Sequence, residues 1–376
     1  MAKRPFVILP NIVVSPNHDI FFLFILNGLP PAWVLSSSFR TITKKTEPSM
    51  TTITMREGLH TAQFAKEILE GLTATPKYLP AKYFYDKAGD RIFQEIMHCE
   101  EYYPFGCELE IFRQRTAELA AAMMQPGGPF DLIELGAGDC KKSAHLLQYL
   151  VRWGAGFTYM PIDISSNIIN HLQTRLPMAI PGLTVKGLNG EYFPMLEEAA
   201  KMSRNRKCVL FLGSNLGNMS PAEARAFCRK LRYHLKPGDM VLIGLDLKKC
   251  PHTILAAYND QEGITKRFNL NLLNRINREL DANFDIDKFE HYPVYDPSTG
   301  ACKSYLISLA DQQVTLRCEG EEQPIRFARY EEIFMEISQK YSIDQVDRLA
   351  DQAFFKPVQR FYDSRGWFVD ALWLAV

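Results

Sequence analysis

The sequence carries no excess charge of either sign and no pattern that marks a metal site. Lys+Arg and Asp+Glu number 43 each in 376 residues, so composition gives no indication of nucleic acid or an anionic membrane as a partner. The eight cysteines form no Cys-x-x-Cys pair, and none of the eight histidines stands at metal-binding spacing. The sequence therefore predicts no bound metal and a reduced, cytoplasmic setting.

Several catalytic signatures and a long hydrophobic run are also missing. We find no Gly-x-Ser-x-Gly elbow, no phosphate loop and no His-Glu-x-x-His, which argues against hydrolase and metalloenzyme functions. The strongly apolar stretch at residues 21–26 is far shorter than the roughly 20 residues that a membrane helix needs. We therefore expect no membrane partner.

The first 55 residues have an unusual composition. Lys3 and Arg4 precede the apolar stretch, as in a secretion signal, but no Ala-x-Ala site follows. We expect residues 1–55 to be a disordered or wrongly translated extension, with Met50 or Met55 as the start. An export signal is the alternative.

The most informative feature is a glycine-rich turn. The strand-like stretch Leu132–Leu135, apolar except for one acid, runs directly into Gly136 and Gly138, and a helix-forming segment follows. Such a turn lets a ligand approach bare backbone while the next helix points its amides at it. Lys141 stands where the dinucleotide fingerprint has its third glycine, and Glu134 precedes the turn, a position where S-adenosylmethionine (SAM) enzymes usually have an acid. An ordinary strand–helix connection is the alternative.

Strand-like and helix-like segments alternate over the centre of the chain, which predicts an α/β protein with a doubly wound parallel sheet. The predicted strands are Leu132–Leu135, Phe157–Ile164, Leu183–Leu188, Cys208–Leu212 and Met240–Leu245. The predicted helices between them are Lys142–Val151, Ser166–Leu176 and Pro221–Leu235.

The flanking regions are more helical at first and then mixed. Before the glycine turn we expect helices over Thr61–Leu72, Arg91–Met97 and Leu109–Met124. After Asp246 we expect helices over Phe268–Leu280 and Glu331–Tyr341, and strands over Tyr305–Ala310, Gln313–Arg317 and Trp367–Val376.

Polar side chains stand where the predicted strands end, which is where such sheets bind ligands. Asp163 is placed to accept both ribose hydroxyls of a nucleoside or, alternatively, to cap the next helix. Glu191 is placed to accept an adenine amino proton and Tyr192 to cover the base, unless they form a plain turn. Lys142 is placed to hold a methionine carboxylate, although a solvated helix position is the alternative.

Tyrosines cluster ahead of the predicted sheet and again beyond it. Tyr85, Tyr102 and Tyr103 precede it, and Tyr258 follows it. A tyrosine offers an apolar ring with one polar group, so these residues are suited to line a small polar pocket. Core packing is the alternative for each of them.

Read together, these segments resemble the histidine-specific SAM-dependent methyltransferases, which trimethylate the α-amino group of histidine on the way to ergothioneine. The resemblance runs from about Thr61 to the C-terminus. It rests on Tyr83-Phe84-Tyr85-Asp86-x-x-Gly89, Glu101-Tyr102-Tyr103-Pro104, Glu134-Leu135-Gly136-x-Gly138, Phe211-Leu212-Gly213-Ser214-x-x-Gly217-Asn218 and Tyr258-x-Asp260.

The resemblance implies a SAM site and an amino-acid site. By analogy with the family, SAM is bound by Gly136, Gly138, Lys142, Asp163, Glu191 and Tyr192. The substrate is held by Tyr85, Tyr102 or Tyr103, Asn218 and Tyr258, with Tyr85 and Tyr258 in the catalytic role of orienting the amine.

One segment departs from the family pattern. The family recognises imidazole with a Glu-x-Ser/Thr segment in a late strand, and our register places Lys303 and Tyr305 there. A lysine has no acceptor for an imidazole proton and repels imidazolium. We therefore expect an altered recognition of the side chain, and histidine to be a poor substrate.

The resemblance also implies a class I SAM-dependent methyltransferase domain, residues 110–246 plus 326–376. A smaller α+β substrate-capping domain is expected at residues 56–109 plus 247–325. The predicted protein is a cytoplasmic monomer that methylates the α-amino nitrogen of a small amino acid. The alternatives are a catalytically silent SAM-binding protein, a nicotinamide dehydrogenase and a true histidine trimethyltransferase.

Overall fold

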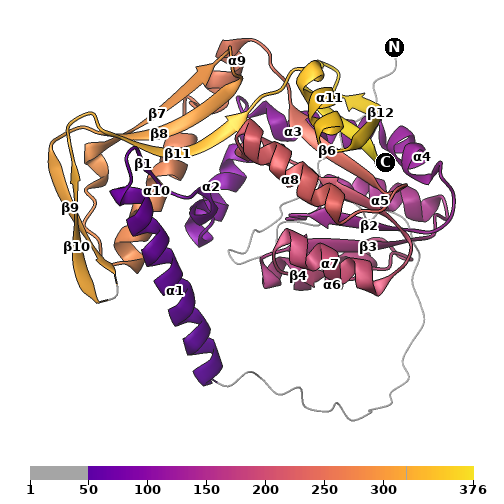
Figure 1. Ribbon diagram of the computed structural model, residues 1–376, viewed down its shortest axis with the longest axis horizontal. Helices are drawn as coiled ribbons and strands as arrows, with labels where there is room; N and C mark the ends of the chain where they lie inside the picture. Colours follow the sequence, from indigo (N-terminus) through magenta and orange to yellow (C-terminus); the bar gives the residue numbers. More distant parts are fainter. Residues whose placement is uncertain (1–49, 319) are drawn as a thin grey trace, which may run out of the picture. The chain divides into compact units, whose positions relative to one another are not determined.

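The computed structural model describes residues 50–318 and 320–376, with side chains from residue 61 onward. Most of the predicted extension, residues 1–49, therefore lies outside the described residues. Residues 50–55 belong to the first helix, α1 (Met50–Thr73). Residues 53–376 form one compact unit, which contains all the elements discussed below (Figure 1).

A seven-stranded sheet occupies the centre of this unit. Its strand order is β12-β13-β6-β5-β2-β3-β4. The strands are β2 (Phe130–Leu135), β3 (Phe157–Asp163), β4 (Leu188–Asn189), β5 (Arg206–Phe211), β6 (Met240–Asp246), β12 (Phe355–Tyr362) and β13 (Phe368–Ala375). Strands β2 to β6 run parallel, whereas β13 is antiparallel to both of its neighbours. The doubly wound α/β class predicted from the sequence is confirmed.

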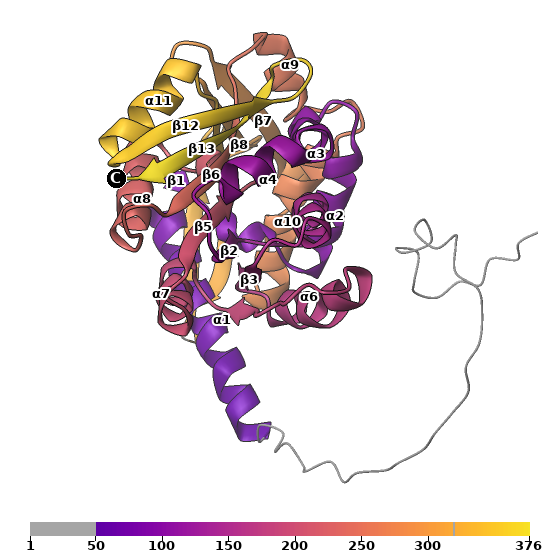
Figure 2. The same ribbon diagram turned by 90° about the vertical axis from the view of Figure 1, so that its right-hand side faces the viewer.

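Helices cover both faces of this sheet, as Figures 1 and 2 show. On one face, α3 (Tyr103–Gln114), α4 (Thr116–Met124), α5 (Ser143–Arg152) and α6 (Ser166–Ala179) contribute to the apolar core. On the other face are α7 (Tyr192–Met202), α8 (Pro221–Tyr233) and α11 (Ile343–Gln352). Every residue of β2 and β6 is buried, because a parallel strand with helices on both sides has no solvent face.

A second, four-stranded sheet has the order β1-β11-β8-β7. Its strands are β1 (Lys77–Tyr78), β7 (Phe289–Asp296), β8 (Ala301–Ser308) and β11 (Glu332–Gln339). A hairpin of β9 (Gln312–Cys318) and β10 (Glu321–Phe327) follows β8 in the chain. A third apolar core joins this part to α1, α2 (Lys87–His98) and α10 (Ile264–Glu279).

The remaining elements are short. They are the helix α9 (Pro251–Ala256) and the 3-10 helices η1 (Ala81–Phe84), η2 (Asn215–Asn218) and η3 (Ile286–Lys288).

One predicted helix is a strand. The segment Glu331–Tyr341, expected to be helical, forms β11 between β1 and β8. Its apolar residues stand close enough together to fit either period, a known ambiguity for short apolar runs. Pairing with two strands that are distant in the sequence decides the outcome.

Smaller differences concern boundaries. The predicted helix over Leu109–Met124 is two helices, α3 and α4, which meet at Arg115. Of the predicted strand Leu183–Leu188, only Leu188 lies in β4, with a single further bridge at Val185. The other predicted strands of the central sheet are confirmed to within a few residues.

The predicted division into two domains stays a prediction. The second sheet extends beyond residue 325, the predicted limit of the capping domain, because β11 belongs to it. Helix α3, conversely, packs on the seven-stranded sheet although its first residues were assigned to the capping domain.

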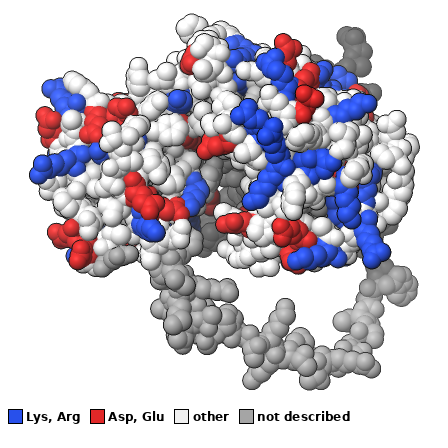
Figure 3. Space-filling view, viewed as in Figure 1, with Lys and Arg blue, Asp and Glu red and all other residues white. Residues whose placement is uncertain are grey.

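Within the part of the chain that the structure describes, no helix is long and apolar enough to cross a membrane. Figure 3 shows positively and negatively charged side chains interspersed on the visible face.

The base of the central sheet offers a stability test away from the strand ends that bind ligands. Lys207 on β5 lies 2.5 Å from Asp131 on β2, and both are buried. We expect Lys207→Met to lower the free energy of unfolding by about 3–5 kcal/mol, because it leaves a buried carboxylate unpaired. Adding Asp131→Leu should recover most of that loss, which urea titration of both variants measures. A double variant as unstable as the single one would contradict this account.

Candidate active site

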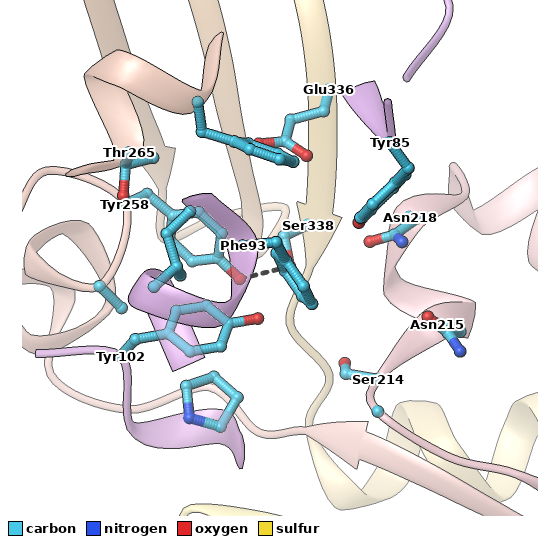
Figure 4. A pocket seen from close by; sticks show the side chains of 15 residues that line it. Tyr85, Phe93, Tyr102, Ser214, Asn215, Asn218, Tyr258, Thr265, Glu336 and Ser338 are labelled. Carbon is cyan, nitrogen blue, oxygen red and sulfur yellow. Dashed lines mark hydrogen bonds between the residues drawn. The ribbon is translucent and has the colours of Figure 1, made fainter. Parts of the chain in front are cut away.

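A pocket lies where the carboxyl end of β5 faces the second sheet. Strand order reverses between β2 and β5, and such a switch point opens a crevice beyond the strand ends. The polar residues that line the pocket include Tyr85, Tyr102, Asn218, Tyr258, Glu336 and Ser338. They come from distant parts of the chain and face one another in Figure 4.

The wall formed by β11 carries Glu336 and Ser338. A β-bulge interrupts its pairing with β8 between Phe334 and Glu336. After the bulge Glu336 is opposite Ser304, and because strand side chains alternate, Ser338 points to the same face as Glu336. Bulges commonly re-aim a side chain next to a functional site, and this one sets which residues of β11 enter the pocket.

The Glu336 carboxylate sits in a poorly solvated place. Burial raises its pKa to about 7, against the opposing effects of the Lys340 charge and a hydrogen bond from Ser304. The group therefore changes charge near neutral pH, which marks it as a functional candidate.

Tyr258 and Ser338 are joined beneath the pocket surface. The Tyr258 hydroxyl donates to Ser338 Oγ over 2.7 Å, the bond drawn in Figure 4. The Lys340 ammonium donates to both oxygens, each at 2.7 Å. Tyr258 is thus held rigidly.

The other two pocket tyrosines present hydroxyls to the cavity. Tyr102 stacks edge-on against Tyr258 with ring centroids 6.2 Å apart, and Tyr85 packs against Phe93 and Phe268. Burial raises the pKa of Tyr85 and of Tyr102. Both are therefore neutral phenols at physiological pH, suited to hydrogen bonding and not to acting as bases.

The glycine turn after β2 has the backbone geometry that the sequence predicted. Gly136 and Gly138 adopt φ values of +70° and +51°, which glycine tolerates best. A Cβ on Gly136 would lie 2.9 Å from the Tyr192 hydroxyl, so a side chain there would collide. The Asp163 carboxylate accepts from the Gly138 amide at 3.2 Å and from the Ser165 amide at 2.9 Å.

The helix-cap alternative for Asp163 does not hold. Ser165 is the N-cap of α6, and its hydroxyl accepts from the Ile168 amide. Asp163 instead braces the glycine turn, with its side chain turned to the end of the sheet.

Lys142 is neither solvated nor free. Its side chain is only 16% exposed, and its ammonium is paired with the buried Glu108. Both Glu108 oxygens also accept from the Gly213 amide at 2.9 Å. Burial and the neighbouring Glu108 raise the pKa of the Asp370 carboxyl.

Glu191 and Tyr192 begin α7 next to this turn. Glu191 is exposed and makes no capping bond, whereas Tyr192 is half-buried and packs edge-on against Phe211 and Phe227. These positions leave the carboxylate available to a ligand beside the glycine turn.

Four of the predicted substrate residues, Tyr85, Tyr102, Asn218 and Tyr258, do line one pocket. Tyr103, offered as an alternative to Tyr102, does not line it. It is buried, and its hydroxyl donates to Asp246 Oδ2 over 2.8 Å.

The expectation for Lys303 and Tyr305 is corrected by the register of the second sheet. Neither residue lines the pocket. Lys303 pairs with Ile337 and Tyr305 with Phe334, so both point away from the face that carries Ser304. A Glu-x-Ser segment that does line the pocket is Glu336-Ile337-Ser338 on β11, the strand next to β8 in the second sheet. The Glu-x-Ser pattern is visible in the sequence, but the search for it was limited to predicted strands and this segment was predicted to be a helix.

The fold and the site together define a class I SAM-dependent methyltransferase. The features that define this class are five parallel strands, an inserted antiparallel strand, here β13, and a glycine turn after the first strand of the sheet, here β2.

The chain belongs to the histidine-specific, SAM-dependent methyltransferase family, whose model matches residues 64–375. It is a SAM-dependent N-methyltransferase, and its cofactor is SAM.

Three relatives show the range of this similarity. The histidine N-alpha-methyltransferase of Mycolicibacterium smegmatis is 34% identical over 281 residues, covering 75% of this chain and 85% of the relative. Ergothioneine biosynthesis protein 1 of Neurospora crassa is 29% identical, and the match covers 76% of this chain and 32% of the relative. The 4-dimethylallyltryptophan N-methyltransferase of Claviceps fusiformis is 30% identical, covering 51% and 56%.

The cofactor side of the site can be tested at Asp163. We expect Asp163→Ala to weaken SAM binding by about 1.5–3 kcal/mol, the range for hydrogen bonds to a charged group. Asp139→Ala is the matched control, because Asp139 is a carboxylate of the same turn that pairs with Lys141 at the surface. Calorimetry on folded variants measures both affinities. Equal SAM affinity in the two variants would contradict a role for Asp163.

Proposed function

We propose that the protein methylates the α-amino nitrogen of L-histidine. The observation that carries this proposal is the pair Glu336 and Ser338 on one wall of the pocket that also contains Tyr102, Asn218 and Tyr258. An acceptor and a hydroxyl on the same face match the two nitrogens of an imidazole ring.

Different residues of the pocket recognise the imidazole side chain and the amino-acid group of the substrate. The Glu336 carboxylate accepts the imidazole N–H, a charge-assisted bond that is strong where water is excluded. Asn218 and Tyr102 bind the carboxylate and amine common to all amino acids, and Tyr85 and Tyr258 orient the amine. In Figure 4, Asn218 and Tyr85 lie together, and Tyr102 and Tyr258 lie together across the pocket from them.

The residues at the sheet end fit SAM. The open backbone at Gly138, where a Cβ would meet no atom within 4 Å, allows a ligand to approach closely. Asp163 would hold the ribose hydroxyls, Glu191 and Tyr192 the adenine, and Lys142 the methionine carboxylate. Bound SAM supplies a methyl group on a positively charged sulfur.

The chain's own task is to deliver the amine unprotonated and in line. No acid catalyst is needed, because the sulfur leaves as a neutral thioether. The pocket phenols stay neutral, so they donate to or accept from the amine without removing its proton. Positioning of this kind supplies up to about 7–11 kcal/mol in model reactions.

The substrate is settled by one direct experiment. The protein is incubated with SAM and a panel containing histidine, tryptophan, 4-dimethylallyltryptophan and aspartate, and the products are identified by mass spectrometry. Methylated histidine as the main product supports the proposal, and methylation of another member alone would replace it. Absence of any S-adenosylhomocysteine release would favour the catalytically silent alternative.

Removing the charge of Glu336 should affect substrate binding more than turnover. We expect Glu336→Gln to raise the KM for histidine roughly 10- to 100-fold, because a charge-assisted hydrogen bond is lost. The kcat should fall much less. Glu332→Gln is the matched control, since Glu332 is exposed on the same strand. Steady-state kinetics with equal effects from both substitutions would rule out recognition by Glu336.

Glu336 also predicts a pH dependence. Its pKa in the folded protein is about 7, above the ordinary value of 4.5. We expect KM for histidine to fall as pH rises through about 7, because the carboxylate form accepts the imidazole proton. The imidazole of the substrate itself titrates near 6.5. The KM of Glu336→Gln should therefore still change with pH near 6.5 but no longer show the change caused by the carboxyl.

The same shift has a consequence for stability. A carboxyl with a raised folded pKa stabilises the fold only while protonated, so stability falls as pH rises from about 4.5 to about 7 and stays lower above. Relative to wild type, Glu336→Gln should gain in melting temperature between about pH 5 and pH 8. A constant difference across that range would contradict the raised pKa.

A further inference from the structure

A fully buried ion pair lies directly behind the recognition wall of the pocket. Lys340 is the second residue after Ser338, and its ammonium is 2.8 Å from Asp246 Oδ2 at the end of β6. Neither side chain has any exposed surface. A buried lysine is costly unless its partners satisfy it, and the assigned roles leave this one unexplained.

All three ammonium hydrogens of Lys340 have hydrogen-bond acceptors. An ammonium has three donors and no acceptor. Those of Lys340 go to Asp246 Oδ2, to the Tyr258 hydroxyl oxygen and to Ser338 Oγ. Both hydroxyl oxygens therefore accept from the same cation.

This arrangement fixes where the hydroxyl protons point. Tyr258 and Ser338 are 2.7 Å apart, and Tyr258 donates to Ser338, as expected for the more acidic hydroxyl. Ser338 Oγ then accepts two hydrogen bonds, from Tyr258 and Lys340, which fills both of its lone pairs. Its own proton has no remaining direction except out of the triangle, where the pocket lies.

We propose that Lys340, held by Asp246, is a positioning residue that fixes Ser338 as a hydrogen-bond donor toward the substrate. The inference rests on the proposed histidine function and sharpens it. With Glu336 as acceptor and Ser338 as donor, the wall selects a ring with one N–H and one unprotonated nitrogen. That ring is neutral imidazole. Imidazolium, with two N–H groups, meets a donor at Ser338.

Two substrate analogues isolate the donor. The two pyrrolylalanines keep one ring N–H and carry C–H in place of the acceptor nitrogen. Against either, the Ser338 proton is left without a partner in a buried site, which costs roughly 5- to 100-fold in kcat/KM relative to histidine. We therefore expect wild type to prefer histidine over the better analogue by about 10-fold or more.

Two substitutions test the origin of that preference. Ser338→Ala removes the donor and should reduce the preference to about 3-fold or less. Lys340→Met should do the same, because Ser338 is then free to turn its proton to Tyr258. Lys249→Met is the matched control. Lys249 also binds Asp246, and it donates to Tyr103, but it has no hydrogen bond to Tyr258 or Ser338. The Lys249→Met variant should prefer histidine over the pyrrolylalanines as strongly as wild type does.

The outcomes separate the two proposals. If the folded protein does not methylate histidine, the proposed function fails and this inference with it. If histidine is methylated but wild type does not discriminate against the pyrrolylalanines, only the inference is overturned. It is also overturned if Ser338→Ala loses the preference while folded Lys340→Met keeps it, or if Lys249→Met loses it equally. Should Lys340→Met fail to fold, the wild-type ratio and Ser338→Ala still decide whether Ser338 donates.

Discussion

The buried contact between Asp246 and Lys340 is the constraint on which the site depends, because it ties the two sheets together where they meet. Asp246 ends β6 of the central sheet, and Lys340 follows β11 of the second sheet. The backbones are joined at the same point, where the Tyr341 amide donates to the Asp246 carbonyl over 3.0 Å. The position of β11, and hence of Glu336 and Ser338, is thereby fixed relative to the glycine turn.

This junction brings chemically different halves of a site together. The central sheet contributes open backbone and the carboxylate of Asp163, which suit a nucleoside. The second sheet contributes Glu336 and Ser338, which suit a polar ring. Methyl transfer needs the two ligands in line and shielded from water, so a rigid junction matters more than any single acid or base.

Much of the fold was predictable because it is local. The central strands are mostly apolar, and the glycines that follow β2 are needed at positive φ whatever surrounds them. Segments with a clear period, such as Pro221–Tyr233 with its Ser220 capping box, were also predictable. The strand identity of β11 was not, because its apolar residues suit two periods and only pairing with β1 and β8 selects one.

The sequence by itself determined the class of sheet, the glycine turn and the tyrosines, asparagine and carboxylates that are candidates for the site. Tertiary structure decided which of them meet. It placed Tyr102 in the pocket and buried the adjacent Tyr103 against Asp246. It turned Lys303 away and Glu336 inward. The physical reason is the two-residue period of a strand, since one bulge or a shift of one residue exchanges its faces, and strand register depends on partners far away in the chain.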